Sequence, residues 1–331
     1  MFIEQKQTVE WTMDTYSQES LLEEIESALE SAEAMVTDFY GSKEIDETPN
    51  QLFHYTDDVG MRSILESGNL WMTDVFSMND PSEIYYGISY AASEIEKAAN
   101  ISKNYYYQLF ASRFLNVYSD NLHRIFHMFV TSFSNSGEKL DQWRAYADDG
   151  RGYALVFDGA SLDAGFIANN KTHNSTTKID YESKNLAKIQ DPILNLYMPI
   201  IGKLSKSKLN PIQVNKILQK ISVNLSFSLL QSGLFFKHEA YANEEEFRFC
   251  QLHAFNQKPA NLKVRYQPHR TIKYVEFDWK MAVPQSLRKI IIGPSANKER
   301  SLEFVHTCLE MFGLTHVDVE ISRIPYRSSR L

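Results

Sequence analysis

The sequence predicts an α+β fold with a mixed or antiparallel sheet and a helical segment inserted near residues 183–238. Strand-like runs and amphipathic helices are interleaved without the regular strand–helix–strand alternation of a parallel sheet. The C-terminal third is rich in strands, whereas residues 184–205 and 211–233 carry two helical patterns. The chain has 331 residues, 43% of them apolar, which is enough to bury a sizeable core and excludes wholesale disorder.

Residues 18–40 predict an amphipathic helix, because Leu21, Ile25 and Leu29 recur at helical spacing between glutamates. The other predicted elements are, in chain order, a strand at 52–56, a helix at 59–66, a strand at 69–73, helices at 80–99 and 105–118, strands at 126–134, 153–158 and 176–181, helices at 184–205 and 211–233, strands at 246–252, 262–266, 272–278 and 289–293, a helix at 298–312 and a strand at 316–321.

The start of the helix at 80–99 has a complete local explanation. Asp80 suits the N-cap, Pro81 suits the first helical position, and Glu83 can reach back to the cap amide. We therefore interpret the run Asn79–Glu83 as a helix start rather than as a binding motif.

The formal net charge of −8 conceals two segments of opposite charge. Residues 1–60 carry fifteen acidic and two basic residues, whereas residues 183–238 carry eight lysines and one aspartate. The plainest interpretation is a pair of oppositely charged solvated faces that touch each other. The alternative is that the basic segment holds a phosphate backbone.

Composition excludes several classes of protein. Two cysteines in 331 residues are too few for a disulfide-stapled secreted scaffold, and no Cys/His spacing resembles a zinc site. The N-terminal residues lack the basic and apolar regions of a signal peptide, and no apolar run approaches a membrane span. We expect a soluble cytoplasmic protein without membrane contact or a metal ion.

His54 is the first candidate site residue, because the run His54–Thr56 ends a short strand just before a helix N-terminus. There it can present a donor to a ribose hydroxyl. The alternative is a partly buried histidine satisfied by a neighbouring carbonyl group.

Glu244, Glu246 and Arg248 are predicted to share one strand face, with Phe247 and Phe249 on the other. Two carboxylates at this spacing suit a reaction that develops positive charge on a sugar, one stabilising the charge and the other orienting a nucleophile. The alternative is an ordinary charged sheet face.

Ser132 and Ser134 end a predicted strand, and either could orient a catalytic carboxylate. Trp143 and Tyr146 follow at helical spacing and could stack on a planar ring. An aromatic core with a capping serine explains the same residues equally well.

The order of short motifs along residues 50–328 resembles that of a widespread bacterial family of cytoplasmic domains, known mainly as a domain of unknown function. The motifs are FHYT (53–56), ILxxGxLW (64–71), NDPxE (79–83), SFS (132–134), LxQWxxY (140–146), GYALxFD (152–158), YxxExExR (241–248), IIIGP (290–294) and SxIPYR (322–327). The series spans both halves of the chain, so we predict a single domain over 49–331 and an acidic helical arm over 1–48. The arm would serve dimerisation or regulation.

At the level of the fold, the same layout looks like the ADP-ribosyltransferase superfamily. That resemblance implies that His54 binds a ribose of NAD while Tyr55 and Thr56 line the nicotinamide subsite. It also implies that Ser132 or Ser134 corresponds to a serine on the middle strand. The motif does not choose between the two serines.

The same resemblance implies that Glu246 is the catalytic glutamate and that Glu244 helps to select the acceptor. The register leaves the assignment open between the two, and we favour Glu246. The segment 183–238 has no counterpart in a minimal fold of this superfamily.

The resulting functional expectation is an NAD-dependent ADP-ribosyltransferase or NAD glycohydrolase, acting as a bacterial toxin or phage-defence effector. NAD would be the substrate, and a nucleic-acid base, a protein side chain or water the acceptor. The alternative is a non-catalytic nucleic-acid-binding module that uses the basic helices of 183–238. A related enzyme that transfers an RNA 2′-phosphate to NAD is disfavoured by Glu244 and Glu246, where such enzymes use basic residues.

Overall fold

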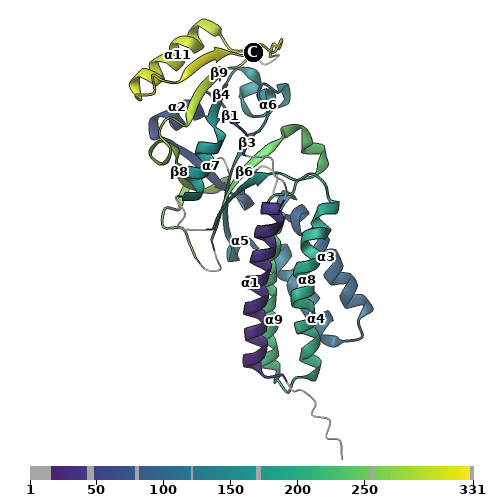
Figure 1. Cartoon of the computed structure of the whole chain (residues 1–331). Coiled ribbons are helices and arrows are strands. Elements are labelled where there is room, and N and C mark those ends of the chain that lie inside the picture. The colour runs from purple at the N-terminus through teal and green to yellow at the C-terminus, as the bar shows by residue number, and fades with distance from the viewer. Residues whose placement is uncertain are drawn as a thin grey trace, which may run out of the picture.

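The computed structural model describes residues 16–42, 48–78, 82–120, 122–168, 173–253, 257–267 and 269–328. It consists of a bundle of long helices and a branched sheet covered by shorter helices (Figure 1). The predicted α+β fold with a mixed sheet is therefore confirmed.

The helices are α1 (Gln18–Ser42), α2 (Asp58–Ser67), α3 (Ser82–Ile101), α4 (Tyr105–Asp120), α5 (Leu122–Ile125), α6 (Leu140–Tyr146), α7 (Gly159–Ala168), α8 (Lys184–Lys203), α9 (Pro211–Gly233), α10 (Trp279–Ala282) and α11 (Lys298–Met311), with a 3-10 helix, η4, at Glu239–Glu244. The strands are β1 (Gln51–Thr56), β2 (Asn69–Asp74), β3 (His127–Ser134), β4 (Tyr153–Asp158), β5 (His173–Lys178), β6 (Glu246–His253), β7 (Lys263–Gln267), β8 (Arg270–Asp278), β9 (Leu287–Ile292) and β10 (Asp318–Ile321).

Most predicted elements form within a few residues of their expected bounds. β5 spans His173–Lys178, where a strand at 176–181 is expected. Helices α5, α7 and α10 are not among the predicted elements. In α7 the apolar residues do not gather on one side of the helix and so give no helical period.

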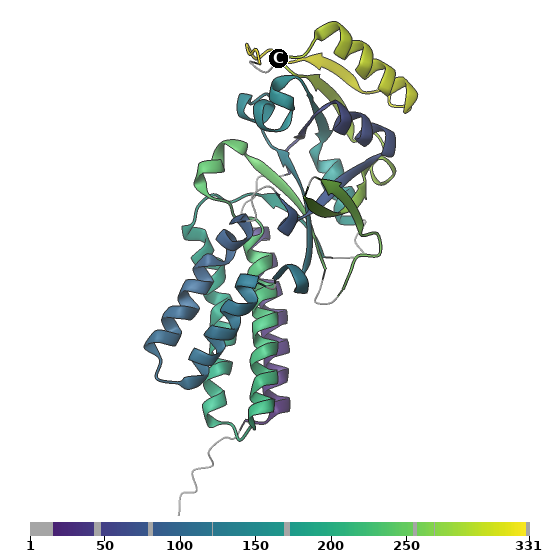
Figure 2. The ribbon, with the colours of Figure 1, turned by 180° about the vertical axis from the view of Figure 1, so that it is seen from behind.

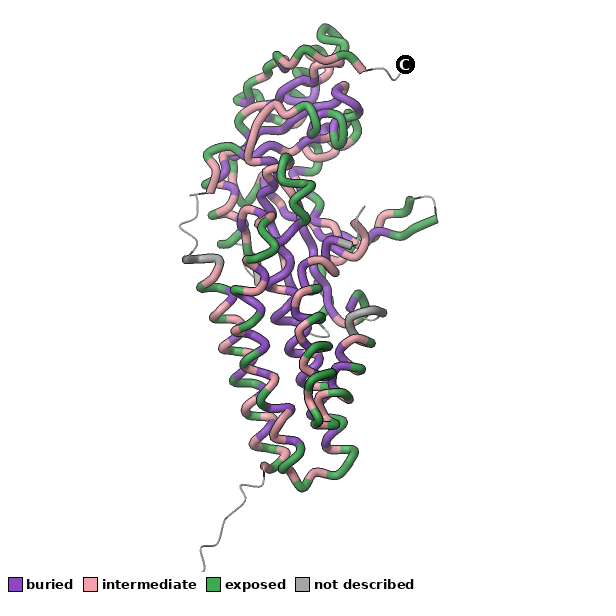
Figure 3. The backbone as a smooth tube through the Cα atoms, turned by 90° about the vertical axis from the view of Figure 1, so that its right-hand side faces the viewer, coloured by how far each residue is buried: buried purple, intermediate pink, exposed green. Residues whose placement is uncertain are grey.

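Three separate segments of the chain build the helical bundle. α1 packs along α8 and α9, and α3 and α4 complete the group (Figures 1 and 2). The buried side chains of all five helices belong to one apolar core, and Figure 3 shows their buried stripes turned inward. Helix α9 begins with a capping box between Asn210 and Gln213 and with Pro211 at the first turn.

Helices α3 and α9 are in close backbone contact at two glycines. A Cβ atom on Gly87 would lie 2.3 Å from the carbonyl oxygen of Gly233, and one on Gly233 would lie 2.5 Å from that of Gly87. No side chain fits at such distances, so this crossing requires glycine on both helices.

The acidic helix α1 contacts both basic helices, α8 and α9, as the plainest interpretation of the charge pattern predicts. The Nζ of Lys203 lies 2.7 Å from Glu24, and that of Lys220 lies 2.8 Å from Glu26. The apolar face of α1 is buried in the same contact with α8 and α9. That face is therefore not available for the dimerisation expected of a free arm.

The sheet has the strand order β10-β9-β4-β1-β3-β2-β8-β7, with β6 pairing β3 and β5 pairing β6 as a branch. All pairs are antiparallel except β9 with β10, which is parallel.

Strand β3 is the point at which the sheet divides. One edge of β3 pairs with β6 along its whole length, from His127↔His253 to Ser134↔Glu246. On the other edge, β1 pairs only through Phe53↔Ser134, and β2 pairs only through Val130 and Phe129. β1 and β2 thus diverge along residues 131–133 of β3.

A second apolar core fills the space between the sheet and helices α2, α7 and α11. A smaller cluster lies on the opposite face, where α6 packs against β1. None of the described helices combines the length and the apolar character that crossing a bilayer requires.

Candidate functional site

A cleft of about 430 Å³ lies where the sheet divides. Its walls come from β1, β2, β3, β6, the β7–β8 hairpin, η4 and residues of α3 and α6. Because β1 and β2 separate at this point, polar side chains of β3 and β6 are reachable from the cleft.

The carboxylate of Glu246, the first residue of β6, is buried at the bottom of this cleft, with 4% of the residue exposed. Its Oε1 accepts hydrogen bonds from the Oγ of Ser132 at 2.5 Å and from the Nε of Arg248 at 2.7 Å. Its Oε2 lies 3.4 Å from the Nζ of Lys237. The backbone N–H of Glu246 donates to the hydroxyl of Tyr181.

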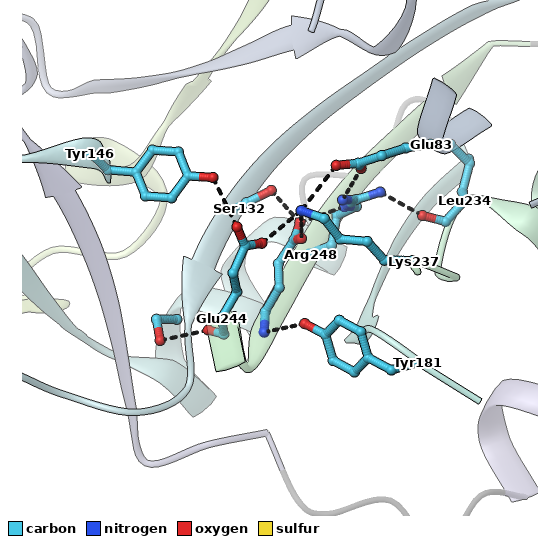
Figure 4. Close-up of polar contacts among 10 residues, drawn as sticks. Glu83, Ser132, Tyr146, Tyr181, Leu234, Lys237, Glu244 and Arg248 are labelled. Atoms are coloured by element: carbon cyan, nitrogen blue, oxygen red, sulfur yellow. Dashed lines mark hydrogen bonds and ion pairs between the residues drawn. The ribbon is translucent and has the colours of Figure 1, made fainter. Parts of the chain in front are cut away.

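Lys237 connects three carboxylates. Its Nζ lies 2.6 Å from Glu244, 2.9 Å from Glu83 and 3.4 Å from Glu246 (Figure 4). The other oxygen of Glu83 accepts from the Nη2 of Arg248 at 3.0 Å. We call Glu83, Lys237, Glu244, Glu246 and Arg248 the ionic cluster. Its three carboxylates and two cations leave an excess of one negative charge.

The cluster keeps Glu246 ionised. Burial alone would raise the pKa of this carboxyl, but the charges of Arg248 and Lys237 and the hydrogen bonds from Arg248 and Ser132 lower it to about 2. Burial likewise opposes the charge of Lys237, yet the carboxylates of Glu246, Glu83 and Glu244 raise its pKa above the usual range.

His54 lies on β1 beside the divided edge of β3. Its Nδ1 is 3.3 Å from the carbonyl oxygen of Ser132, and its ring packs edge-on against Phe133. Since a carbonyl oxygen only accepts hydrogen bonds, Nδ1 is the protonated nitrogen and Nε2 is an acceptor. Burial lowers the pKa of His54, and the bond to Ser132 offsets this only in part, so the ring is neutral at pH 7.

The two serines of β3 have different surroundings. Ser132 contacts the carboxylate of Glu246, whereas Ser134 donates to the backbone carbonyls of Ser136 and Glu244. Only Ser132 is placed to orient Glu246, and Ser134 positions the chain that leads into β6.

Glu246 and Arg248 share one face of β6, with Phe247 and Phe249 packed in the apolar core behind it. Glu244 is not part of the strand. It ends η4, and the positive φ of 44° at Glu245 breaks the backbone between them. The carboxylate of Glu244 nevertheless reaches Lys237.

Tyr146 lines the cleft, and its hydroxyl donates to the second oxygen of Glu244 at 3.1 Å. The expectation that Trp143 would stack on a ligand is not met. Trp143 is completely buried between α6 and β1, edge-on to Tyr55, because helix α6 turns it toward the sheet.

Tyr55 borders the cleft, but its ring packs on Trp143 and its hydroxyl accepts from the amide of Glu138. Thr56 is not among the cleft residues, since its side chain lies against Gly60 at the start of α2. Of residues 54–56, His54 and Tyr55 thus line the cleft and Thr56 does not.

Sequence reasoning did not identify Lys237, and it read Glu83 only as part of a helix start. Asn79, Asp80 and Pro81 lie outside the described residues, while Glu83 sends its carboxylate to Lys237 and Arg248. One sequence feature does single out Lys237: it is a lone lysine that directly follows three apolar residues in the run LFFKH, after α9.

In the part of the chain that the structure describes, no three His, Cys, Asp or Glu side chains are grouped in a way that could hold a metal ion. The polar residues that line the cleft include His54, Glu83, Ser132, Tyr146, Lys237, Glu244 and Glu246.

Neither a search of curated proteins nor one of solved structures finds a match. A family model covers the segment from α6 to β6, which includes Tyr146, Lys237, Glu244, Glu246 and Arg248. His54, Glu83 and Ser132 precede it. Residues 142–249 match the family described as "Protein of unknown function (DUF2971)".

Proposed function

We propose that the chain binds NAD in the cleft and cleaves the bond between nicotinamide and ribose, as an ADP-ribosyltransferase or an NAD glycohydrolase. The observation that carries this proposal is the buried, ionised carboxylate of Glu246. Ser132 orients this carboxylate through a hydrogen bond, and the backbone carbonyl of Ser132 contacts His54.

The reaction needs a negative charge near the sugar. When the C1′–N1 bond breaks, its electron pair passes to the nicotinamide nitrogen and leaves positive charge on C1′ and the ring oxygen. A fixed carboxylate in a buried site stabilises such charge more than it would in water. Glu246 meets this requirement. The other four members of the ionic cluster carry two negative and two positive charges, so the cluster as a whole has one net negative charge.

The acceptor then forms a bond to C1′ and passes its proton to the carboxylate of Glu244. Tyr146 and Glu244 are the pair that could orient it, because they are hydrogen-bonded to each other and both line the cleft. The acceptor would be water, a nucleic-acid base or a protein side chain.

His54 would bind a ribose hydroxyl. Its Nε2 can accept a hydrogen bond because Nδ1 is committed to the carbonyl of Ser132. A neutral imidazole also adds no positive charge beside the developing cation.

Unrestrained consumption of NAD would harm the cell that contains the enzyme, which suits a toxin or a phage-defence effector. The alternative, nucleic-acid binding by α8 and α9, has less support. Lys203 and Lys220 are paired with glutamates of α1, and Lys237 lies in the ionic cluster.

The test is release of nicotinamide from NAD, followed by chromatography, with and without cell lysate as a source of acceptor. Glu246→Gln should lower the rate at least a hundredfold. Glu320→Gln is the matched control, because Glu320 also pairs with a lysine but lies on β10, outside the cleft. No release by the wild-type protein, or equal rates for the wild type and Glu246→Gln, would overturn the proposal.

A further inference from the structure

Two arginines of the β7–β8 hairpin line the cleft without an acidic partner. Arg265 lies on β7 and Arg270 begins β8. Neither forms an ion pair with any residue that the structure describes, although every basic residue of the ionic cluster forms at least two. An unpaired guanidinium group in a cleft is a potential binding group for an anion.

Arg265 is held in place by an aromatic ring. Its guanidinium carbon lies 5.3 Å from the ring centroid of Trp71, and that ring is packed against Tyr274 at 4.5 Å. The Nε of Arg265 is buried and has no hydrogen-bond partner within the described structure. A buried donor of this kind costs free energy unless a ligand satisfies it.

Arg270 is exposed and only lightly restrained. It donates to the side-chain oxygen of Gln267 at 3.0 Å and to the carbonyl oxygen of Ser77 at 3.3 Å. Its remaining donors are available to a ligand in the cleft.

The two guanidinium groups disfavour each other in the absence of an anion. Burial is the main cause that lowers the pKa of Arg265, and the charge of Arg270 adds to it. An anion bound between the two would offset both effects.

The arginines and the ionic cluster belong to opposite sides of the divided sheet. β6, which carries Glu246, pairs with one edge of β3, while β2, β8 and β7 continue from the other edge. The cleft therefore has the carboxylate of Glu246 on one side and the guanidinium groups of Arg265 and Arg270 on the other. This arrangement suits a ligand in which the reacting group is separated from a negatively charged group.

We propose that Arg265 and Arg270 bind the phosphate groups of a nucleoside diphosphate moiety, with Trp71 positioning Arg265. The proposal rests on the proposed function only in identifying this moiety with the ADP part of NAD. Binding of phosphate by the hairpin would leave the ribose next to nicotinamide free to approach Glu246 and His54.

Isothermal titration calorimetry with ADP, adenosine and inorganic pyrophosphate tests the subsite without requiring turnover. ADP should bind at least tenfold more tightly than adenosine, and its affinity should fall as salt is raised. Arg265→Gln and Arg270→Gln should each weaken ADP binding about tenfold or more and leave the affinity for adenosine unchanged. Pyrophosphate binding that is lost in both variants would assign the contact to the phosphates themselves.

Arg300→Gln is the control for the loss of one positive charge, because Arg300 lies exposed on α11, away from the cleft. Thermal unfolding of each variant checks its fold, and the exposed Arg270 supplies a second variant if Arg265→Gln does not fold. Failure of ADP to bind, equal affinities for ADP and adenosine, or unchanged ADP affinity in the folded variants would overturn the subsite. ADP binding through these arginines without any release of nicotinamide from NAD would instead overturn only the proposed function.

Discussion

The hydroxyl of Ser132 lies 2.5 Å from Oε1 of Glu246, and this hydrogen bond runs diagonally across two strands. In the register of β3 and β6, Ser132 is opposite Arg248, and Glu246 is opposite Ser134. The same oxygen of Glu246 also accepts from Arg248. Two donors on Oε1 therefore fix the carboxylate so that Oε2 faces Lys237.

Replacing Ser132 by alanine should reduce nicotinamide release about tenfold or more, because a hydrogen bond to a charged group contributes roughly 2 kcal/mol. Chemical unfolding should show a loss of stability of similar size or smaller. The comparison is Ser134→Ala, which loses bonds only to the carbonyls of Ser136 and Glu244. If both variants lose activity equally, Ser132 has no special role in orienting Glu246.

The strand that carries Glu246 could be predicted because its pattern is local. Phe247 and Phe249 alternate with Glu246 and Arg248, and a period of two fixes which side faces the core. The choice between Ser132 and Ser134 could not be predicted in the same way. Both lie on one face of β3, and only the pairing of β3 with β6 decides which reaches the carboxylate.

The rest of the site depends on contacts between distant segments. The start of α3 carries Glu83, and Lys237 follows α9. The two side chains form an ion pair because their helices pack in the bundle, and no local sequence pattern predicts that contact. A similar limit applies to α1. Its apolar face was recognised, but sequence periodicity does not say whether a face packs within the chain or against a second copy.

The stability of the protein should depend on pH through Glu246. Its pKa is lowered in the folded state, so its ionised form stabilises the fold above its ordinary value of 4.5, and that stabilisation is lost as the pH falls toward about 2. The difference in free energy of unfolding between wild type and Glu246→Gln should therefore shrink by on the order of 3 kcal/mol between about pH 5 and pH 2.

Urea unfolding of both proteins at several pH values across this range measures that change. Because the two proteins share every other titrating group, subtracting their curves gives the contribution of Glu246 together with its coupling to the rest of the ionic cluster. A difference that stays constant with pH would show that the carboxylate is not stabilised by the cations around it.

Removing the central cation should be more damaging than removing any one carboxylate. Lys237→Met leaves Glu83, Glu244 and Glu246 with Arg248 alone, and loss of one partner from a buried ionic group costs about 3–5 kcal/mol. Adding Glu244→Gln should restore part of this loss, because it removes one of the uncompensated charges. A double-mutant cycle from urea unfolding measures the coupling.

Lys220→Met is the matched control for this cycle. Lys220 also pairs with a glutamate, Glu26, but both side chains are more than one-third exposed. Its removal should cost less than about 1 kcal/mol. Equal losses for Lys237→Met and Lys220→Met would mean that burial does not strengthen the ionic cluster.

The crossing of α3 and α9 should tolerate no added methyl group. In Gly87→Ala the new Cβ would meet the carbonyl oxygen of Gly233 at 2.3 Å, and backbone cannot move aside as a flexible side chain can, so the helices must separate. Overpacking of this kind costs about 3 kcal/mol, measured as a lower midpoint of urea or thermal unfolding. Gly202→Ala on α8 is the comparison, because its Cβ would meet only the side chain of Tyr107, whose hydroxyl is nearest at 3.2 Å, and alanine favours the helix.

The Gly87→Ala substitution should also affect activity. Glu83 lies one helical turn before Gly87, and Lys237 lies four residues after Gly233, so separation of these helices should also pull the ionic cluster apart. Gly87→Ala should then reduce nicotinamide release as well as stability. A variant with full stability and activity would show that the two helices are not held at this distance.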